Sequence, residues 1–168
     1  VARDLSKLLQ TNWTRRETWN RNYSETRSPQ IPSAILELLS HQNFTDMRYA
    51  HDPLVKFHIA RSIYKSLLRY VNFQHRITDV VVQPLPVKDI WANLDSKANR
   101  VTLGWTPMLD PLEPSAMPSQ YIVYTKIGNR GFDNGQIVAE PSFTMAITPG
   151  VQYCFRVAAL NEGGESFP

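Results

Sequence analysis

Residues 84–168 place the strongest constraint on what this chain can fold into. From Pro84 onward, short runs of alternating apolar and polar residues are separated by turn-forming residues. The clearest runs place Val101, Leu103 and Trp105 at every second position, and the run that starts at Tyr153 does the same. Side chains of a strand alternate between its two faces, so this pattern indicates strands with one buried face. Several such strands joined by turns predict an antiparallel β-sandwich.

The same region resembles the fibronectin type III domain, an all-β sandwich of the immunoglobulin-like class. The resemblance depends on Trp105, on Tyr121–Tyr124, on Tyr153–Asn161 and on Gly164–Ser166. It implies that Trp105 anchors the core. It also implies that Tyr153 forms a tyrosine corner, in which its hydroxyl bonds a backbone group at the preceding turn.

The resemblance further implies one more strand than the sequence contains, so we read the domain as incomplete at its C-terminal end. The strand from Tyr153 to Leu160 would then have an open edge, and open edges tend to pair with other chains. We also expect an open strand edge at Ile31–Leu36. These edges predict self-association, or partners supplied by other parts of a longer parent protein.

The first half of the chain centres on residues 31–46. The run Ile31–Leu36 is mostly apolar and is followed by a single carboxylate, Glu37. A short apolar run of this kind predicts a strand buried on both faces. In α/β proteins, ligands gather beyond the carboxyl ends of strands, so Glu37 is the strongest candidate for a chemical role. The alternative is a structural pair between Glu37 and an arginine, because an unpaired buried charge is costly.

Residues 31–46 also resemble a late segment of the zinc-dependent N-acetylmuramoyl-L-alanine amidases, which runs P-x-x-[LI]-x-E-x-x-F-x-S-N-x-x-D. The positions in register are Pro32, Ile35, Glu37, Asn43 and Asp46. Two positions depart from this pattern, Ser40 for Phe and Gln42 for Ser, and Leu39 stands where Gly is usual in the family. The resemblance covers residues 1–74 and implies that they are the C-terminal portion of a partial α/β catalytic domain.

The amidase resemblance implies a chemistry and a partner. Glu37 would be the catalytic base, and His41 and Asn43 would border the substrate groove. The family's zinc ligands are two His and a Glu that precede this segment, so they would lie upstream of Val1. We therefore expect no metal ligands within this chain and no activity from it alone. The expected partner is peptidoglycan or another envelope polysaccharide.

Two helices are predicted in the first half. Val1–Gln10 has helical apolar spacing, and a second helix should run from Pro53 to about Asn72, with Asp52 as its N-cap. We expect this second helix to face the core of its domain with an apolar stripe, which comprises Ile59, Ile63, Leu67 and Val71. Residues 75–83 are predicted to link the two domains.

Charge, cysteine content and hydropathy exclude several kinds of partner and site. Residues 1–83 carry 12 Lys and Arg against 7 Asp and Glu, whereas residues 84–168 carry 6 against 8. No basic run exceeds the pair Arg15 and Arg16, so a nucleic-acid partner is not expected. The single cysteine, Cys154, excludes an internal disulfide and a Cys-based metal site. No stretch is long and apolar enough to predict a membrane span.

Three functions compete on these patterns. The first is a fragment of a peptidoglycan amidase with a fibronectin type III spacer or adaptor. The second is a non-catalytic carbohydrate-binding or adhesion protein, which an exposed aromatic row involving Trp91 or Tyr124 would favour. The third is an extracellular polysaccharide-degrading enzyme such as a lyase. By resemblance, each is secreted, periplasmic or on the bacterial cell surface.

Overall fold

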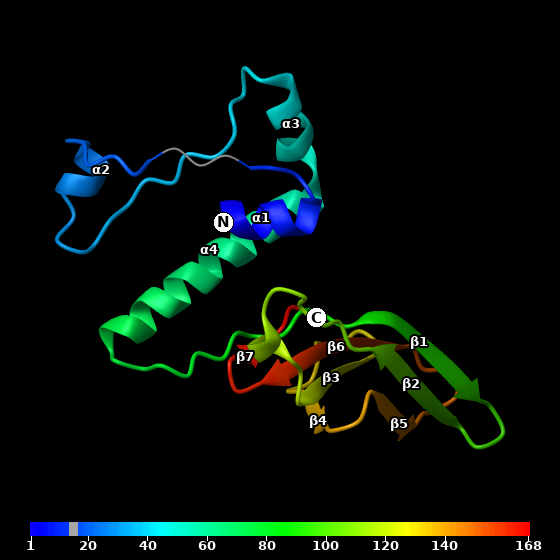
Figure 1. Ribbon diagram of the computed structural model, residues 1–168. Helices are drawn as coiled ribbons and strands as arrows, with labels where there is room; N and C mark the ends of the chain where they lie inside the picture. The colour runs from blue at the N-terminus through cyan, green and yellow to red at the C-terminus, as the bar shows by residue number, and fades with distance from the viewer. Residues whose placement is uncertain (14–16) are drawn as a thin grey trace. The chain divides into compact units, whose positions relative to one another are not determined.

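The computed structural model of the protein describes residues 1–13 and 17–168, so Arg15 and Arg16 lie outside the described residues. The chain forms two compact units, Val1–Leu67 and Leu68–Pro168. The division lies inside a helix, upstream of the linker predicted over residues 75–83. Figure 1 shows helices in the first unit and mainly strands in the second.

The regular secondary structure of the first unit, in its described residues, consists of helices joined by irregular segments. Leu54 N donates to Asp52 Oδ1 at 2.8 Å, which is the N-cap that the sequence predicts for the long helix. The helices are α1 (Ala2–Leu9), α2 (Ser24–Arg27), α3 (Phe44–His51) and α4 (Pro53–Gln74), the last of which continues into the second unit.

The strand predicted at Ile31–Leu36 is not formed, so the partial α/β interpretation of this half is wrong for the described residues. The segment is irregular and Ile31 is 73 % exposed. A buried strand depends on hydrogen bonds to neighbouring strands. Residues 1–13 and 17–67 contain no strand that could supply them. Without a strand at Ile31–Leu36 there is also no open edge there to recruit a partner.

The buried face of α4 differs from the predicted apolar stripe. Arg61, Ser62 and Lys65 are buried, whereas Leu67 and Val71 are exposed. The helix period is as predicted, but an acidic side chain of α1 contacts the polar side of α4, as described below. Periodicity identifies a helix, but it cannot show which neighbour will cover which face.

The second unit confirms the predicted antiparallel sandwich. Its two sheets have the strand orders β1-β2-β5 and β4-β3-β6-β7, and every neighbouring pair is antiparallel. The strands are β1 (Lys88–Asp95), β2 (Arg100–Thr106), β3 (Gln120–Ile127), β4 (Gln136–Val138), β5 (Ser142–Ala146), β6 (Tyr153–Asn161) and β7 (Gly164–Glu165). A 3-10 helix, η1 (Pro114–Ala116), precedes β3.

The core of the sandwich is built from the inward positions of β2, β3 and β6. The rings of Trp105 and Tyr121 meet edge to face with centroids 5.3 Å apart. Full burial of one large apolar side chain contributes about 1.5–3 kcal/mol, so this cluster supplies much of the unit's stability. The buried cluster is Val101, Leu103, Trp105, Tyr121, Val123, Val157 and Ala159.

The segment that enters the sandwich is fixed to it. Val82 is fully buried, and its carbonyl accepts a hydrogen bond from Asn161 Nδ2 at 2.9 Å. The same amide donates to the carbonyls of Ser115 at 3.1 Å and Met117 at 3.3 Å. These contacts explain why the end of the predicted linker belongs to the second unit.

Strand β6 is paired unequally on its two edges. It pairs with β3 from Tyr153 to Leu160, whereas β7 pairs with it at Leu160 and Asn161. Within the described residues, no strand pairs with residues 153–158 on the β7 side.

Candidate functional site

Glu37 lies in the exposed, irregular segment that precedes α3. The carboxylate is therefore not buried, so no cost of burial requires a charged partner or a chemical role for Glu37. Its proposed role as a catalytic base stays a prediction that depends on the amidase register.

The neighbouring register positions have local structural roles. Asn43 Oδ1 accepts hydrogen bonds from Thr45 N at 2.9 Å and Asp46 N at 3.4 Å, which makes Asn43 the N-cap of α3. Asp46 Oδ2 accepts from Ser40 N at 2.7 Å and closes the preceding turn. His41 lies exposed in that turn. The spacing of Asn43 and Asp46 thus has an explanation in helix capping alone.

The backbone conformation of Leu39 bears on the comparison with the amidase segment. Its φ angle is 56°, in the left-handed region. A non-glycine residue there loses roughly 1–2 kcal/mol to contact between its Cβ and the backbone. Leu39 stands where Gly is usual in the amidase family, and its backbone has the conformation that glycine favours although the side chain differs.

The amidase resemblance places its zinc ligands upstream of Val1, so the residues of this chain do not test that site. A protein zinc site needs three or four converging His, Cys or carboxylate ligands. Among residues 1–13 and 17–168, no three such side chains are close enough to share a metal ion. We therefore derive no catalytic step through zinc from these residues.

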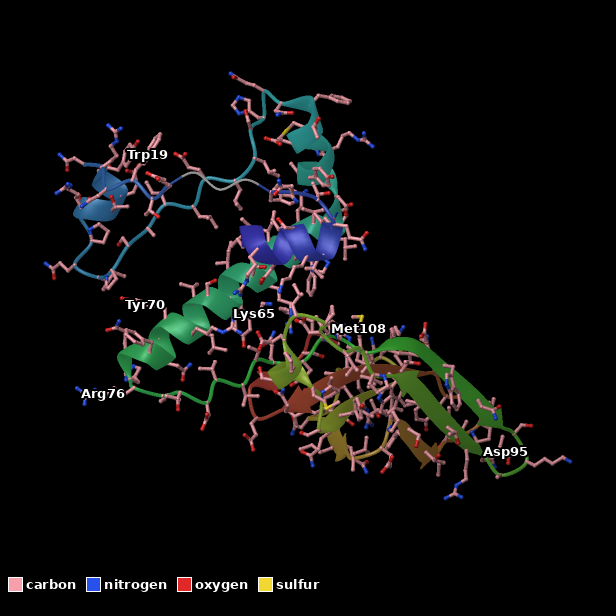
Figure 2. The ribbon with its side chains drawn as sticks, viewed as in Figure 1. Trp19, Lys65, Tyr70, Arg76, Asp95 and Met108 are labelled. Carbon is pink, nitrogen blue, oxygen red and sulfur yellow. The ribbon has the colours of Figure 1, made fainter. Side chains whose placement is uncertain are left out.

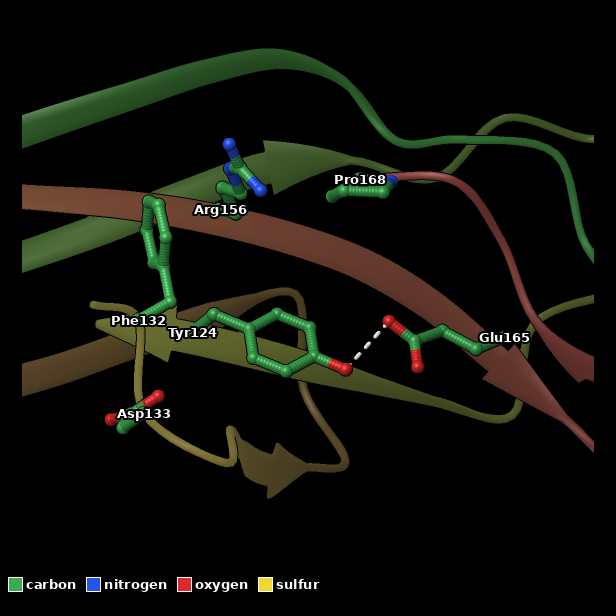
Figure 3. A pocket seen from close by; sticks show the side chains of 6 residues that line it. All are labelled: Tyr124, Phe132, Asp133, Arg156, Glu165 and Pro168. Atoms are coloured by element: carbon green, nitrogen blue, oxygen red, sulfur yellow. Dashed lines mark hydrogen bonds between the residues drawn. The ribbon is translucent and has the colours of Figure 1, made fainter. Parts of the chain in front are cut away.

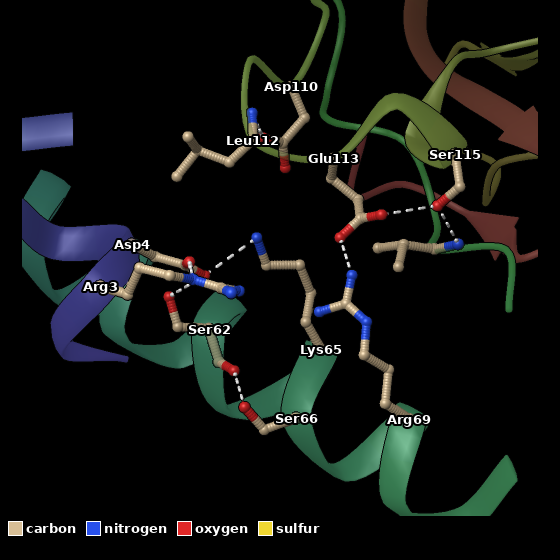
Figure 4. A network of polar contacts seen from close by, with 11 residues as sticks. Arg3, Asp4, Ser62, Lys65, Ser66, Arg69, Asp110, Leu112, Glu113 and Ser115 are labelled. Carbon is tan, nitrogen blue, oxygen red and sulfur yellow. Dashed lines mark hydrogen bonds and ion pairs between the residues drawn. The ribbon is translucent and has the colours of Figure 1, made fainter. Parts of the chain in front are cut away.

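A buried ion pair joins α1 to α4 in the first unit. Lys65 Nζ lies 3.1 Å from Asp4 Oδ2, and Ser62 Oγ donates to the same oxygen at 3.1 Å (Figure 4). Burial alone would raise the pKa of Asp4, but the hydrogen bond and charge of Lys65, with the Ser62 hydroxyl, hold it below its usual value. Figure 2 labels Lys65 on α4. The sequence offers no sign of this pair, because Lys65 resembles any lysine on a solvated face.

A second polar cluster lies within the second unit. The Arg69 guanidinium contacts the buried Glu113 carboxylate, and Ser115 Oγ donates to Glu113 Oε1 at 2.9 Å (Figure 4). Val82 N donates to Ser115 Oγ at 3.3 Å. These contacts connect the last turns of α4, the loop before β3 and the segment before β1, so their role is structural.

Trp105 and Tyr153 occupy the positions that the fibronectin type III resemblance gives them. Trp105 is buried in the core. Tyr153 Oη accepts a hydrogen bond from Thr148 N at 3.0 Å, at the turn that precedes β6. This contact has the form of a tyrosine corner.

The outer face of the β1-β2-β5 sheet carries an exposed tryptophan. Trp91 lies opposite Gly104 in the register of β1 and β2, and Trp91 is 53 % exposed. A Cβ atom built on Gly104 would lie 2.1 Å from Trp91 Cζ2. The indole therefore occupies the space over Gly104, and any larger residue there would displace it.

Neutral polar side chains continue this face. Asn93 lies opposite Thr102, and Thr102 lies opposite Thr144. The Oγ1 atoms of the two threonines are hydrogen-bonded at 3.0 Å. Ser142 lies opposite Gly104 on the other side from Trp91. The face therefore combines one open aromatic ring with a row of amide and hydroxyl groups.

A hollow on the other sheet is lined by side chains that contact one another. Tyr124 Oη donates to Glu165 Oε1 at 2.7 Å, and this bond, with partial burial and the nearby acidic charges, raises the pKa of Tyr124 (Figure 3). The Arg156 guanidinium lies 4.3 Å from the centroid of the Phe132 ring. The lining residues are Tyr124, Phe132, Asp133, Arg156, Glu165 and Pro168.

The strand orders, the Trp105 core and the corner at Tyr153 together define the class of the second unit. It is an antiparallel sandwich with the architecture of fibronectin type III and immunoglobulin-like domains. Among the described residues, no helix has the length and apolar character needed to cross a membrane.

No protein-family model and no curated protein matches the chain. Solved structures similar to part of it include domains A168–A170 of titin, with 28 % identity, TM-score 0.45, and 54 % of this chain and 30 % of that one covered. The titin kinase with its flanking domains has 25 % identity and TM-score 0.44, with 52 % of this chain and 16 % of that one covered. A fibronectin type III-like protein from Clostridium thermocellum has 19 % identity and TM-score 0.37, with 50 % of this chain and 83 % of that one covered. The match thus spans less than a third of either titin structure.

Proposed function

We propose that the chain is part of a non-catalytic binding protein directed at envelope polysaccharide, in which the sandwich is the recognition module. The observation that carries this proposal is the exposed indole of Trp91, seated on a glycine at a sheet surface. We place the protein outside the cell or in the periplasm, as the family resemblances imply.

The exposure of Trp91 favours a binding role over a structural one. Tryptophan is usually well buried, because its ring removes a large apolar area from water. The core tryptophan, Trp105, follows that rule. Tryptophan is also enriched among the side chains that contribute most to binding at interfaces.

A sedimentation assay tests the proposal. The full chain is mixed with insoluble peptidoglycan, chitin or cellulose and spun down, at low salt and at about 1 M salt, where exposed charges are screened within about 3 Å. We expect retention on at least one of these polysaccharides at both salt concentrations, because a stacking contact does not depend on charge. A chain that stays in the supernatant with all three would contradict a polysaccharide-binding role.

The amidase is the second candidate, supported by the register of residues 31–46 and by the left-handed conformation of Leu39. In this proposal, Glu37 is the base of a longer peptidoglycan hydrolase whose metal is held by residues outside this chain. The test measures peptide release from purified peptidoglycan by the longer protein and by its Glu37→Gln variant. Release by the wild type that disappears in Glu37→Gln supports the amidase. Equal release by both would remove Glu37 from the chemistry.

We also propose that the chain self-associates through β6. Support comes from the stretch of β6, residues 153–158, that has no strand on its β7 side within the described part of the chain. Light scattering across a concentration series should show dimers, because an unpaired strand edge can pair with the same edge of a second copy. A monomer at all concentrations would refute the idea.

A further inference from the structure

We propose that the outer face of the β1-β2-β5 sheet is a binding site for a neutral saccharide chain. Trp91 is its stacking platform, and Asn93, Thr102 and Thr144 supply its hydrogen bonds. This inference rests on the proposed binding function and assigns that function to one face and one class of ligand.

The geometry of Trp91 gives a sugar ring a surface to stack on. The indole lies over Gly104, so the backbone of β2 supports it from the sheet side while more than half of the residue stays exposed. The faces of aromatic rings carry partial negative charge, and the C–H groups on one face of a pyranose carry partial positive charge. A tryptophan already held against the sheet also has little rotamer freedom left to lose on binding.

The polar groups lie at a suitable spacing from the indole. Asn93 is two residues from Trp91 along β1, which places it roughly 7 Å away on the same face. Thr102 and Thr144 extend this row across the neighbouring strands, each roughly 5 Å from the next. The amide of Asn93 offers donors and an acceptor, and each hydroxyl can do both, as sugar hydroxyls require.

The charge of this face favours a neutral ligand. Beyond Asn93 and Thr102, the next outward-facing pair of β1 and β2 is Asp95 and Arg100. The two charges are of opposite sign and adjacent. Residues 84–168 as a whole carry 6 basic and 8 acidic side chains. Aromatic platforms for single-stranded nucleic acid sit in basic grooves, and an acidic polysaccharide would need the same complement. A neutral glycan matches the surface better than either.

A protein partner is the main competing occupant, because tryptophan is common at the centre of protein interfaces. Such centres are surrounded by other apolar side chains that exclude water. On the outer face, the register neighbours of Trp91 are Asn93, Thr102 and Ser142, all of them small or polar, and the exposed apolar Ile90 adjoins Trp91 where the register of β1 shifts. This arrangement favours a hydroxyl-rich ligand.

The test titrates the full chain with cellohexaose and with chitohexaose and follows the heat of binding. We expect Trp91→Ala to weaken binding about tenfold, which is about 1.4 kcal/mol and lies within the range of about 1–3 kcal/mol measured for a base stacked on an aromatic side chain. Trp19→Ala is the matched control, because Trp19 is 56 % exposed but lies in the first unit, and it should leave binding unchanged. Asn93→Ala and Thr102→Val should each weaken binding several-fold, and they keep the test valid if Trp91→Ala fails to fold.

Several outcomes would overturn the inference. Binding that is equally strong in wild type, Trp91→Ala, Asn93→Ala and Thr102→Val would move the site elsewhere while leaving the binding function in place. Trp91-dependent binding of heparin or of a single-stranded oligonucleotide, with none of either hexasaccharide, would refute the neutral ligand class. Failure of the chain to bind any insoluble polysaccharide in the sedimentation assay would refute the underlying function itself.

Discussion

Replacing Lys65 by Met should destabilise the contact between α1 and α4 far more than replacing Arg3. Both side chains lie near Asp4, with Lys65 Nζ 3.1 Å and Arg3 Nε 3.5 Å from a carboxylate oxygen. The side chain of Lys65 is 5 % exposed, whereas that of Arg3 is 77 % exposed. The two substitutions therefore form a matched pair that differs in burial.

The magnitude follows from what each substitution leaves behind. Removing one member of a buried ion pair costs about 3–5 kcal/mol, because the remaining charge stays buried without its partner. Asp4 keeps the hydrogen bond from Ser62, so we expect Lys65→Met to lie at the lower end, about 3 kcal/mol. Exposed ion pairs contribute about 0–1 kcal/mol, so Arg3→Met should change little.

Hydrogen exchange measured on peptides from α1 and α4 is the appropriate assay. A chain with two units need not unfold in one step, so a global unfolding curve would mix their contributions. A loss of about 3 kcal/mol should reduce protection in these helices roughly a hundredfold, at about tenfold per 1.4 kcal/mol. Equal protection in the Lys65→Met and Arg3→Met variants would refute the reasoning that burial makes the Asp4–Lys65 contact strong.

Acid should reproduce the loss in the wild type. The folded pKa of Asp4 is held below its ordinary value of 3.8, so its stabilising contribution is complete above that value. The contribution disappears as the pH falls through the lower folded-state pKa. The Asp4→Asn variant should lack this part of the acid dependence, and a wild type whose α1 is equally stable across that range would contradict the ion pair.

Three further substitutions test the rest of the fold. Tyr153→Phe removes the hydrogen bond that Thr148 N donates and should lower the stability of the sandwich by about 1 kcal/mol, measured by hydrogen exchange on peptides from β3 and β6; unchanged protection would show that the corner contributes nothing. Leu39→Gly should stabilise the first unit by roughly 1 kcal/mol in hydrogen exchange, because glycine tolerates a φ of 56°, and a loss of stability would contradict strain there. Gly163→Ala should destabilise the sandwich by more than about 1 kcal/mol, because the new Cβ would lie 2.6 Å from a backbone oxygen. Gly131→Ala, where a Cβ would meet nothing within 4 Å, is its control, and equal hydrogen-exchange protection of the sandwich in these two variants would contradict a steric cost at Gly163.

The sandwich could be predicted because its pattern is repeated and local. Val101, Leu103 and Trp105 alternate in the sequence and lie together in the core. Strand β4 was missed because three residues, Gln136–Val138, are too few to show a period.

The first unit could not be predicted to the same extent, because its secondary structure and buried faces depend on contacts between segments that are distant in the sequence. Ile31–Leu36 has the composition of a buried strand, but a strand forms only where others accept its hydrogen bonds. Helix α3 was missed because its first residues read as a polar loop, although Asn43 followed by Asp46 is a recognisable capping sequence. The burial of Lys65 depends on Asp4, far away in the sequence, and no local pattern contains that information.

The side chain of Asn161 has a mechanical consequence for the sandwich. Its amide group contacts three carbonyls, those of Val82, Ser115 and Met117, which come from separate parts of the chain. Tension applied to the chain ahead of Val82 would load several hydrogen bonds at once, whereas a fraying end breaks them one after another. In a pulling experiment, Asn161→Ala should therefore lower the rupture force for this segment more than it lowers the equilibrium stability of the unit.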